Sequence, residues 1–414
     1  MPLKDNSAVP PERGGTFAAL RYPNYRLWFI GQMLSLFGTW MQSTAQGYLV
    51  FQLTHSSAYL GYVGFASGIP IWLFTLFAGV AADRMPRRRL LLLTQTYMLL
   101  LALVLAVLVF AQVVRPWHIV LLAFLLGTAN AFDAPARQAF VLEMVERKAL
   151  SNAIALNSAM FNIAIVVGPA LGGLAYAAFG PGWCFTLNAL SFLAVIVALL
   201  AMRLSSRQLQ QSNGAALSEL REGLAYTLSH PSIRVLIGIV AVASLFGMSF
   251  FTLVPAWAVR VLHGDALTNG LLLSARGVGS LASALAIAAL SARWIRGKVL
   301  VLASLVFPLM LLAFSFLRQL AASLAMLAAV GASMILVYNL ANTLIQVNTE
   351  DRLRGRVMSF YSLSILGLTP IGALLAGGLA QAIGEPNTVL LGAVVCLACA
   401  ALVWFCFPSL RDLR

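Results

Sequence analysis

Residues 79–89 read Gly79-Val80-Ala81-Ala82-Asp83-Arg84-Met85-Pro86-Arg87-Arg88-Arg89, and they join two long apolar segments of the chain. One carboxylate and four guanidinium groups fall within seven of these residues. An apolar helix that meets such a cluster has reached a membrane surface. Because short cytoplasmic loops of membrane proteins collect Lys and Arg, the arginines predict that this surface is the cytoplasmic one.

The composition excludes a soluble globular domain. Hydrophobic residues make up 61% of the 414 residues and charged residues 10%, whereas an ordinary globular chain carries about 25% charged residues. Runs of about 20 apolar residues predict membrane-spanning helices instead. The net charge of +14 lies mainly in short loops between these runs. We interpret it as a topology signal and a contact with membrane lipids, and we expect no nucleic-acid partner.

Residues that could carry chemistry are sparse. The four cysteines fall inside apolar runs, and the four histidines are scattered without metal-ligand spacing. The sequence contains no phosphate-binding loop of the Gly-x-x-x-x-Gly-Lys-Ser/Thr type. We therefore expect no metal, no cofactor and no enzymatic activity. The polar first 26 residues lack an apolar core segment, so we also expect no cleavable signal peptide.

Twelve membrane spans are predicted, all of them helices, because backbone polar groups in lipid must be paired within the segment. The expected spans are 27–53, 58–82, 90–113, 117–141, 152–178, 182–202, 233–258, 268–292, 298–317, 320–346, 356–383 and 387–407. With the N-terminus inside, the inner loops and tails hold 23 of the 27 Lys and Arg residues. The outer loops hold only Arg115, Arg260 and Arg318. This asymmetry predicts that both termini are cytoplasmic.

The chain divides into two halves at its one long connection. Residues 208–214 have the composition of a flexible linker, and leucines at 217, 220, 224 and 228 predict an amphipathic helix on the inner membrane face. The expected organisation is a cytoplasmic tail at 1–26, a six-helix half at 27–202, a cytoplasmic linker at 203–232, a second six-helix half at 233–407 and a cytoplasmic tail at 408–414.

Glycines repeat between the two halves in register. At an offset of 209 residues, Gly61 matches Gly270 and Gly68 matches Gly277. At an offset of 204 residues, Gly168 matches Gly372 and Gly173 matches Gly377. Glycines at matched depths mark matched sites of close helix approach. A run of such matches indicates a duplicated six-helix unit.

The pattern Gly-x-x-x-Asp-Arg-x-x-Arg-Arg resembles the loop between the second and third helices of the major facilitator superfamily. That family usually has Gly where this chain has Pro86, and the second-half copy at 292–298 lacks the Asp. The twelve spans, the central linker and the repeat extend the resemblance over the whole chain. It implies an all-α integral membrane fold of two pseudo-symmetric six-helix halves, which transports by alternating access.

The resemblance also implies a cytoplasmic latch that locks the outward-open state. Asp83 is expected to face the positive N-terminus of the helix that starts near Arg356. Arg84 and Arg87 are expected to pair with acids at the end of the fourth span. The alternative is an interfacial carboxylate neutralised by its own arginines. The full latch set is Gly79, Asp83, Arg84, Arg87, Arg88, Asp133 and Arg137.

Two further motifs resemble exporters. Gly168-Pro169-x-x-Gly172-Gly173 is similar to the fifth-helix motif of drug:proton antiporters, although Ala164 stands where a Gly is usual. Residues 130–138 resemble the branch of enterobactin-type siderophore exporters and macrolide efflux proteins. The drug antiporters usually carry an Arg earlier in this helix, and this chain has none between Trp117 and Gly127.

Asp133 is a candidate for coupling transport to protons. Only Asp83 and Asp133 are expected in or at the edge of the twelve spans. If a carboxylate inside the bundle carries the proton, Asp133 is the leading candidate. The alternative, which we favour, is that Asp133 stays ionised and completes the latch with Arg87 or Arg137.

Several polar residues are candidates for a substrate cavity. Arg276 lies about 12 Å inside the eighth span, at 1.5 Å per residue, where a charge is costly unless it faces a cavity. It is a candidate anchor for an anionic or hydroxyl-rich substrate, or an arginine that extends to the headgroups. The candidate cavity set is Gln42, Gln46, Asn157, Arg276, Asn339 and Asn342. For each amide the alternative is a hydrogen bond between helices.

These patterns together predict a monomeric secondary active transporter in a bacterial inner membrane. It is expected to export a small amphipathic compound, such as a drug, a macrolide, a siderophore or a metabolite, in exchange for protons. Alternatives are an importer, a transporter of a lipid-like substrate, a non-transporting membrane sensor or an integral-membrane enzyme. The repeat and latch argue against a sensor, and the missing catalytic cluster argues against an enzyme.

Overall fold

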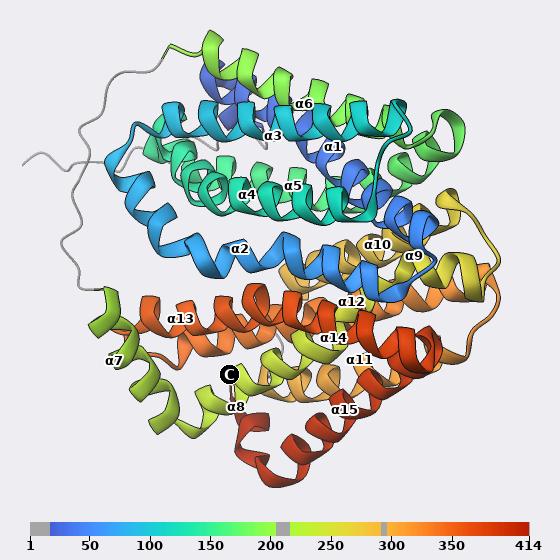
Figure 1. The fold of residues 1–414 in the computed structure, drawn as a ribbon. Helices are drawn as coiled ribbons and strands as arrows, with labels where there is room; N and C mark the ends of the chain where they lie inside the picture. The colour runs from blue at the N-terminus through green and yellow to red at the C-terminus, as the bar shows by residue number, and fades with distance from the viewer. Residues whose placement is uncertain (1–16, 204–215, 291–295, 414) are drawn as a thin grey trace, which may run out of the picture.

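The computed structural model describes residues 17–203, 216–290 and 296–413, and these residues form helices joined by short connections (Figure 1). The N-terminal half contains a short 3₁₀ turn and six long helices: η1 Ala18–Arg21, α1 Pro23–Thr54, α2 Ser57–Arg84, α3 Arg87–Phe110, α4 Pro116–Met144, α5 Arg147–Phe179 and α6 Pro181–Ala201. The prediction of an all-α fold is confirmed.

The C-terminal half begins after the helix α7 Ala216–Ser229, which lies within the predicted linker. Its first span is assembled from α8 Pro231–Val242, η2 Ala243–Met248, η3 Ser249–Leu253, α9 Val254–Ala256 and η4 Trp257–Val261. The remaining elements are α10 Ala266–Leu290, α11 Arg296–Phe316, α12 Leu320–Val347, α13 Arg354–Ser362, η6 Leu363–Gly367, α14 Leu368–Ile383, α15 Glu385–Cys406 and η7 Pro408–Asp412.

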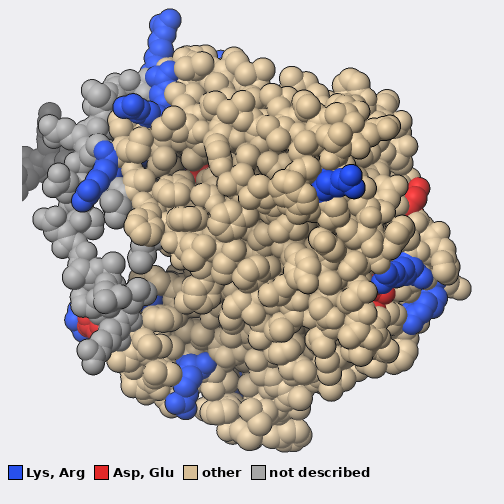
Figure 2. Space-filling view, in the orientation of Figure 1, with Lys and Arg blue, Asp and Glu red and all other residues tan. Residues whose placement is uncertain are grey.

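Eleven helices in the described residues are long and apolar enough to cross a membrane. The helix α1, which corresponds to the first predicted span, is 32 residues long and packs against α5 and α6. On the face shown in Figure 2, Lys and Arg lie toward the two ends of the bundle and leave a broad uncharged middle. This distribution is the one expected for a multi-pass membrane protein.

Two close helix crossings join the halves, and they are related by the predicted repeat. Gly61 of α2 meets Gly377 of α14, and Gly270 of α10 meets Gly173 of α5. A Cβ atom built on Gly377 would lie 2.7 Å from the Gly61 Cα, and one on Gly173 would lie 3.1 Å from the Gly270 Cα. The offset of 209 residues relates Gly61 to Gly270, and the offset of 204 residues relates Gly173 to Gly377. The structure therefore contains the same contact twice.

The halves are in closest contact toward one end of the bundle. We call the end with residues 55–57, 262–265 and 384 the far end, and the end with residues 84–89 and 350–356 the basic end. Along α2, contacts with α14 and η6 run from Ser57 to Trp72, which is the part of α2 nearer the far end. In Figure 1 the halves converge near α9 and α10, whereas the opposite end of α2 bends away from α13.

The first span of the C-terminal half departs from the uniform helix expected over 233–258. It contains π-helical segments at η2 and η4 and a 3₁₀ segment at η3. Another π-helical segment, η6, interrupts the span that contains α13 and α14. Both interrupted spans carry a proline a few residues further on, Pro255 and Pro370, which leaves an upstream carbonyl without its usual donor.

The prediction that only Asp83 and Asp133 lie in or at the edge of the spans is wrong. The helix α4 continues to Met144 and therefore includes Glu143. The helix α15 begins at Glu385, after Gly384 with a φ of 83°. A carboxylate in the first turn is favoured by the positive end of the helix dipole, so α15 starts two residues earlier than hydropathy suggests.

The glycine crossing yields a matched prediction. A methyl group at Gly377 would lie 2.7 Å from both the Gly61 Cα and the Ser57 carbonyl oxygen, whereas one at Gly378 would meet nothing within 4 Å. We expect Gly377→Ala to destabilise the protein by about 1–3 kcal/mol through overpacking. Gly378→Ala should instead be neutral or stabilising by up to about 1 kcal/mol. Thermal unfolding in detergent measures both, and equal melting temperatures for the two variants would contradict the crossing.

Candidate functional site

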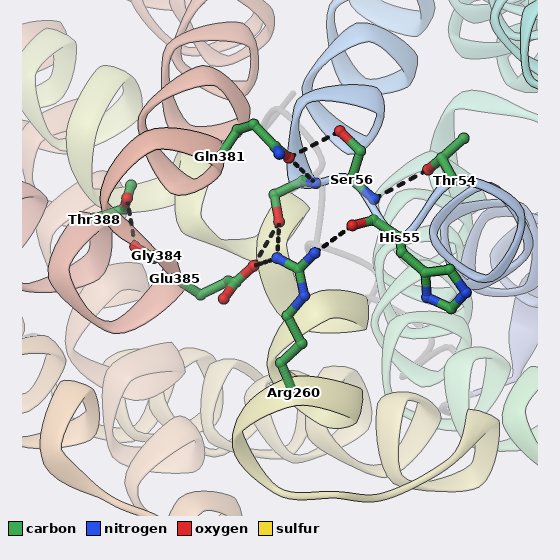
Figure 3. Close-up of polar contacts among 9 residues, drawn as sticks. Thr54, His55, Ser56, Arg260, Gln381, Gly384, Glu385 and Thr388 are labelled. Atoms are coloured by element: carbon green, nitrogen blue, oxygen red, sulfur yellow. Dashed lines mark hydrogen bonds and ion pairs between the residues drawn. The ribbon is translucent and has the colours of Figure 1, made fainter.

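A carboxylate at the far end is shared between the two halves (Figure 3). Glu385 is 4% exposed, and its Oε1 accepts hydrogen bonds from Arg260 Nη1 at 2.8 Å and from Ser57 Oγ at 2.5 Å. Arg260 and Glu385 belong to η4 and α15 of the C-terminal half, whereas Ser57 begins α2 of the N-terminal half. One ion pair therefore also holds a hydroxyl group from the opposite half.

The turn between α1 and α2 supplies further bonds across the same junction. His55 adopts a left-handed backbone with a φ of 48°, and its carbonyl accepts a hydrogen bond from Arg260 Nη2. Gln381 Oε1 of α14 accepts hydrogen bonds from the Ser57 backbone N–H at 3.1 Å and from Ser56 Oγ at 2.9 Å. We call His55, Ser56, Ser57, Arg260, Gln381 and Glu385 the far-end lock.

The sequence alone did not identify the far-end lock. Arg260 was predicted only as an outer-loop charge, and Glu385 was placed in a loop before the last span. One available signal was the repeat, because Gly384-Glu385 occupies the place of Gly180-Pro181 in the first half. A carboxylate at the start of a predicted membrane helix is a reason to look for an arginine at the same end.

The described ion pairs at the basic end stay within one half or join a half to its linker helix. Arg87 Nη1 pairs with Glu143 Oε1 at 2.7 Å, which joins α3 to the end of α4. Arg88 donates to the Leu200 carbonyl of α6, and Arg84 is exposed. Glu222 of the linker helix α7 pairs with Arg352 and Arg356 of the C-terminal half.

Asp83 and Gly79 complete the predicted latch set. The Asp83 side chain lies outside the part of the chain that the structure describes, so its partner stays a prediction. A Cβ atom on Gly79 would meet nothing within 4 Å, so no described neighbour requires a glycine there in this state.

Asp133 lies in a closed network between α3 and α4. Its side chain is 1% exposed, and Oδ1 accepts hydrogen bonds from Thr94 Oγ1 and Gln95 Nε2, each at 2.9 Å. Oδ2 lies 3.3 Å from Arg137 Nε, so the predicted i,i+4 pair is present. All four residues belong to the N-terminal half. The carboxylate is therefore fully partnered without any contribution from the opposite half.

The predicted export motif joins α5 to two different helices. Gly168 and Gly172 face α1, where their Cβ atoms would meet Trp40 and Met41. Gly173 faces α10 of the opposite half, and the Pro169 carbonyl lies against Gly270. The motif therefore supplies the small surface on which the two halves cross, and its residues do not provide a binding group.

The candidate cavity amides have different surroundings. Gln42 accepts a hydrogen bond from Asn188 Nδ2 at 2.8 Å, and Gln46 donates to the Ile119 carbonyl at 3.4 Å, so both are bonded within the N-terminal half. Asn342 accepts from Gln346 at 2.5 Å. The two remaining amides are Asn339, which is exposed, and Asn157, whose Oδ1 is buried without a described partner.

Arg276 lies over an aromatic ring in the C-terminal half. Its guanidinium carbon is 4.2 Å from the centroid of the Phe251 ring, which η3 contributes. Its Nε is buried and makes no hydrogen bond with the described residues. The neighbouring Gly277 packs on Ile165 and Val166 of α5, so Arg276 lies beside a crossing between the halves.

A helical bundle of two repeated halves, joined at one end by a polar lock, defines the class of protein as a membrane transporter. Its architecture is that of the major facilitator superfamily. The family model described as transmembrane secretion effector, MFS_3, matches residues 14–412, and the chain belongs to this family.

Curated relatives match most of the chain. It is 23% identical to the staphyloferrin A transporter of Staphylococcus aureus, over 88% of this chain and 91% of that protein. It is 28% identical to the multidrug efflux pump Tap of Mycolicibacterium fortuitum, over 88% and 91% of the two chains. It is 26% identical to the enterobactin exporter EntS of Citrobacter koseri, over 86% and 85%.

Solved structures confirm the fold. The chain superposes on a D-xylose-proton symporter with a TM-score of 0.74 and 12% identity, over 95% of this chain and 99% of that one. It superposes on an occupied, inward-facing bacterial homologue of the lysosomal transporter Spinster with a TM-score of 0.73 and 14% identity, over 95% and 98%. At these identities the likeness establishes the architecture alone.

The far-end lock predicts a conformational response to one charge. Glu385→Gln keeps the shape of the side chain but removes the charge that Arg260 and Ser57 share, and charge-assisted hydrogen bonds are about twice as strong as neutral ones. We expect the far end to be open in a several-fold larger fraction of molecules. Electron paramagnetic resonance between spin labels at Gln112→Cys and Asn387→Cys, in a variant without native cysteines, reports the distance across the far end.

The matched control for this experiment is Asp265→Asn. Asp265 lies at the same end, but its carboxylate accepts hydrogen bonds from the backbone and hydroxyl of Thr268 in its own half. This variant should keep the parental distance distribution. The same distribution in Glu385→Gln as in the parent would show that the far-end lock does not hold the halves together.

Proposed function

We propose that this protein is a secondary active exporter that moves a small amphipathic compound from the cytoplasm by alternating access. The observation that carries the proposal is the difference between the two ends of the bundle. At the far end Arg260, Gln381 and Glu385 hold residues 55–57 of the opposite half. At the basic end the described ion pairs stay on one side of the junction. This is the arrangement expected of a transporter closed at one end and open at the other.

The orientation follows from the loop charges. The basic end carries the arginine cluster 84–89 and the arginines at 352–356, and cytoplasmic loops are the ones that collect such residues. Under this orientation the far end faces outward, both termini are cytoplasmic, and the described state opens toward the cytoplasm. An exporter loads its substrate in this state.

The substrate class rests on the relatives. Their names specify a siderophore for two of them and several drugs for the third. We therefore place the substrate of this chain among small amphipathic compounds, which enter the bundle from the cytoplasmic leaflet or the cytoplasm.

Export then requires the far end to open and the basic end to close. Opening the far end breaks the bonds from residues 55–57 to Arg260, Gln381 and Glu385. Closing the basic end brings the end of α2 toward the start of α13, where Asp83 meets a helix N-terminus. A contact of this kind contributes on the order of 1 kcal/mol, which is enough to shift a balanced two-state equilibrium several-fold.

The first test concerns export and its energy source. In an efflux-deficient host the protein should lower the accumulation of an amphipathic drug or of an iron-free siderophore, and a protonophore should restore accumulation. Asp83→Asn should abolish this effect while the protein is still inserted in the membrane, because the basic end loses its latch. Accumulation that rises with expression of the protein would indicate uptake, and wild-type export by Asp83→Asn would exclude the latch.

The second test concerns Asp133. Its partners Thr94, Gln95 and Arg137 all move with the same half, so we propose that it keeps its proton state during transport and stabilises the N-terminal half. Asp133→Asn in proteoliposomes should therefore impair proton-driven transport and substrate exchange at zero gradient together. Loss of driven transport with intact exchange would instead identify Asp133 as the proton carrier.

A further inference from the structure

One face of α10 carries a line of polar side chains. Asn269, Arg276 and Ser283 are spaced seven residues apart, which is close to two helical turns, so they share a face. At 1.5 Å per residue they mark a line about 21 Å long. Such a line crosses most of the hydrocarbon thickness of a membrane, which is about 30 Å.

This polar face points into the C-terminal half and away from lipid. Val278 and Leu285 are exposed and mark the outer face of α10. Arg276 is two residues from Val278, which places it about 200° around the helix axis. The contact between Arg276 and the Phe251 ring shows that the inner face looks toward the interrupted span that contains η2 and η3.

The polar atoms on this face lack partners among the described residues. Asn269 is 0% exposed, and neither its Oδ1 nor its Nδ2 is hydrogen-bonded. Ser283 is 6% exposed, and its Oγ is also unpartnered. Arg276 Nε is the third such group. Buried polar groups in native proteins are nearly always hydrogen-bonded, so a row of exceptions on one face points to a partner that is not part of the chain.

Arg276 also differs from four other arginines in whether a carboxylate balances its charge. Arg87, Arg137, Arg260 and Arg356 each pair with a carboxylate. Within the described residues, no ion pair includes Arg276, although it lies ten residues into α10, about 15 Å from the helix start. The Phe251 ring attracts the cation but does not neutralise it. A cation at this depth is stabilised by an anion, so the missing charge is one that a ligand can supply.

The geometry points to an anion-binding track along α10. We propose that Asn269, Arg276 and Ser283, together with the Phe251 ring, bind a carboxylate-bearing substrate whose anionic group lies on Arg276. A planar guanidinium binds a carboxylate through two parallel hydrogen bonds. The amide and the hydroxyl, each about 10 Å away along the helix, then take oxygen or nitrogen groups at the two ends of an extended molecule.

The direction in which the substrate is transported rests on the proposed function, but the binding of an anion at Arg276 does not. The anion-binding track narrows the expected substrates from amphipathic compounds in general to anionic, oxygen-rich compounds. The neighbouring span supports it, because π-helical segments such as η2 are commonly found at functional sites. The track also lies beside the crossing at Gly277, so a bound ligand is next to the surface on which the halves move.

The test compares two dyes that share a xanthene core and differ in charge. Carboxyfluorescein is anionic, and tetramethylrhodamine methyl ester is cationic. Fluorescence polarisation with purified protein in lipid nanodiscs should give at least about tenfold tighter binding of the anionic dye. Arg276→Gln should lower the affinity for carboxyfluorescein by about tenfold or more and leave the rhodamine affinity unchanged. Arg276→Lys should retain part of the anion affinity, because it keeps the charge and loses the planar fork.

Two further variants separate binding from folding. Arg318→Gln is the matched control, because Arg318 also lies over an aromatic ring, Trp257, but donates to the carbonyls of Ser315 and Leu317 at a helix end. It should bind both dyes as the parent does. Asn269→Leu keeps the branching of the side chain at Cγ, should raise the melting temperature because it removes unpartnered polar atoms, and should weaken carboxyfluorescein binding.

The possible outcomes distinguish this inference from the proposed function. Equal affinity of the parent for both dyes, no binding of either, or full carboxyfluorescein binding by Arg276→Gln would overturn the anion track. Inside-out vesicles that do not accumulate a dye which the purified protein binds would contradict export and leave the anion track intact.

Discussion

Inside a hydrocarbon layer a polar group has no water to bind, so it must find its partner within the protein or in a ligand. This constraint sorts the polar groups of the bundle into three kinds. Asp133 is satisfied within one half by Thr94, Gln95 and Arg137. Glu385 is satisfied jointly by both halves at the far end. Arg276 has no described carboxylate partner. The first kind stabilises one half, the second couples the two halves, and the third is the charge that we propose binds the substrate.

The contacts between the halves are also of two kinds, which have different roles. The glycine crossings at Gly61–Gly377 and Gly173–Gly270 bring helix backbones together without directional bonds, so they tolerate a change of angle. The far-end lock consists of directional, partly charge-assisted bonds that either form or break. The halves can therefore rotate against each other at the glycine crossings. The far-end lock determines which end is closed. The π-helical and 3₁₀ segments that interrupt the membrane spans lie in the C-terminal half, which also carries Arg276.

Much of this architecture was accessible from the sequence. Within the described residues, most of the predicted spans coincide with helices, because long apolar runs flanked by charged loops form helices in a membrane. The repeat predicted the paired sites at which Gly61 and Gly270 meet their partners. The far-end lock was missed because Glu385 and Arg260 are 125 residues apart in sequence, and only the fold shows that they meet Ser57. The polar face of α10 was seen only at Arg276, since the lack of partners for Asn269 and Ser283 is a property of packing.

The central claim is that the far end must open in every transport cycle. The most direct measurement places cysteines at Ser56 and Gln381, whose side chains hydrogen-bond across the halves, in a variant without native cysteines. The account predicts that oxidation to a disulfide stops transport and that reduction restores it. A second cysteine pair at Asn24 and Arg203, which contact each other within one half, should leave transport unchanged when oxidised. Transport at the uncrosslinked rate through a protein fully crosslinked between positions 56 and 381 would contradict the account.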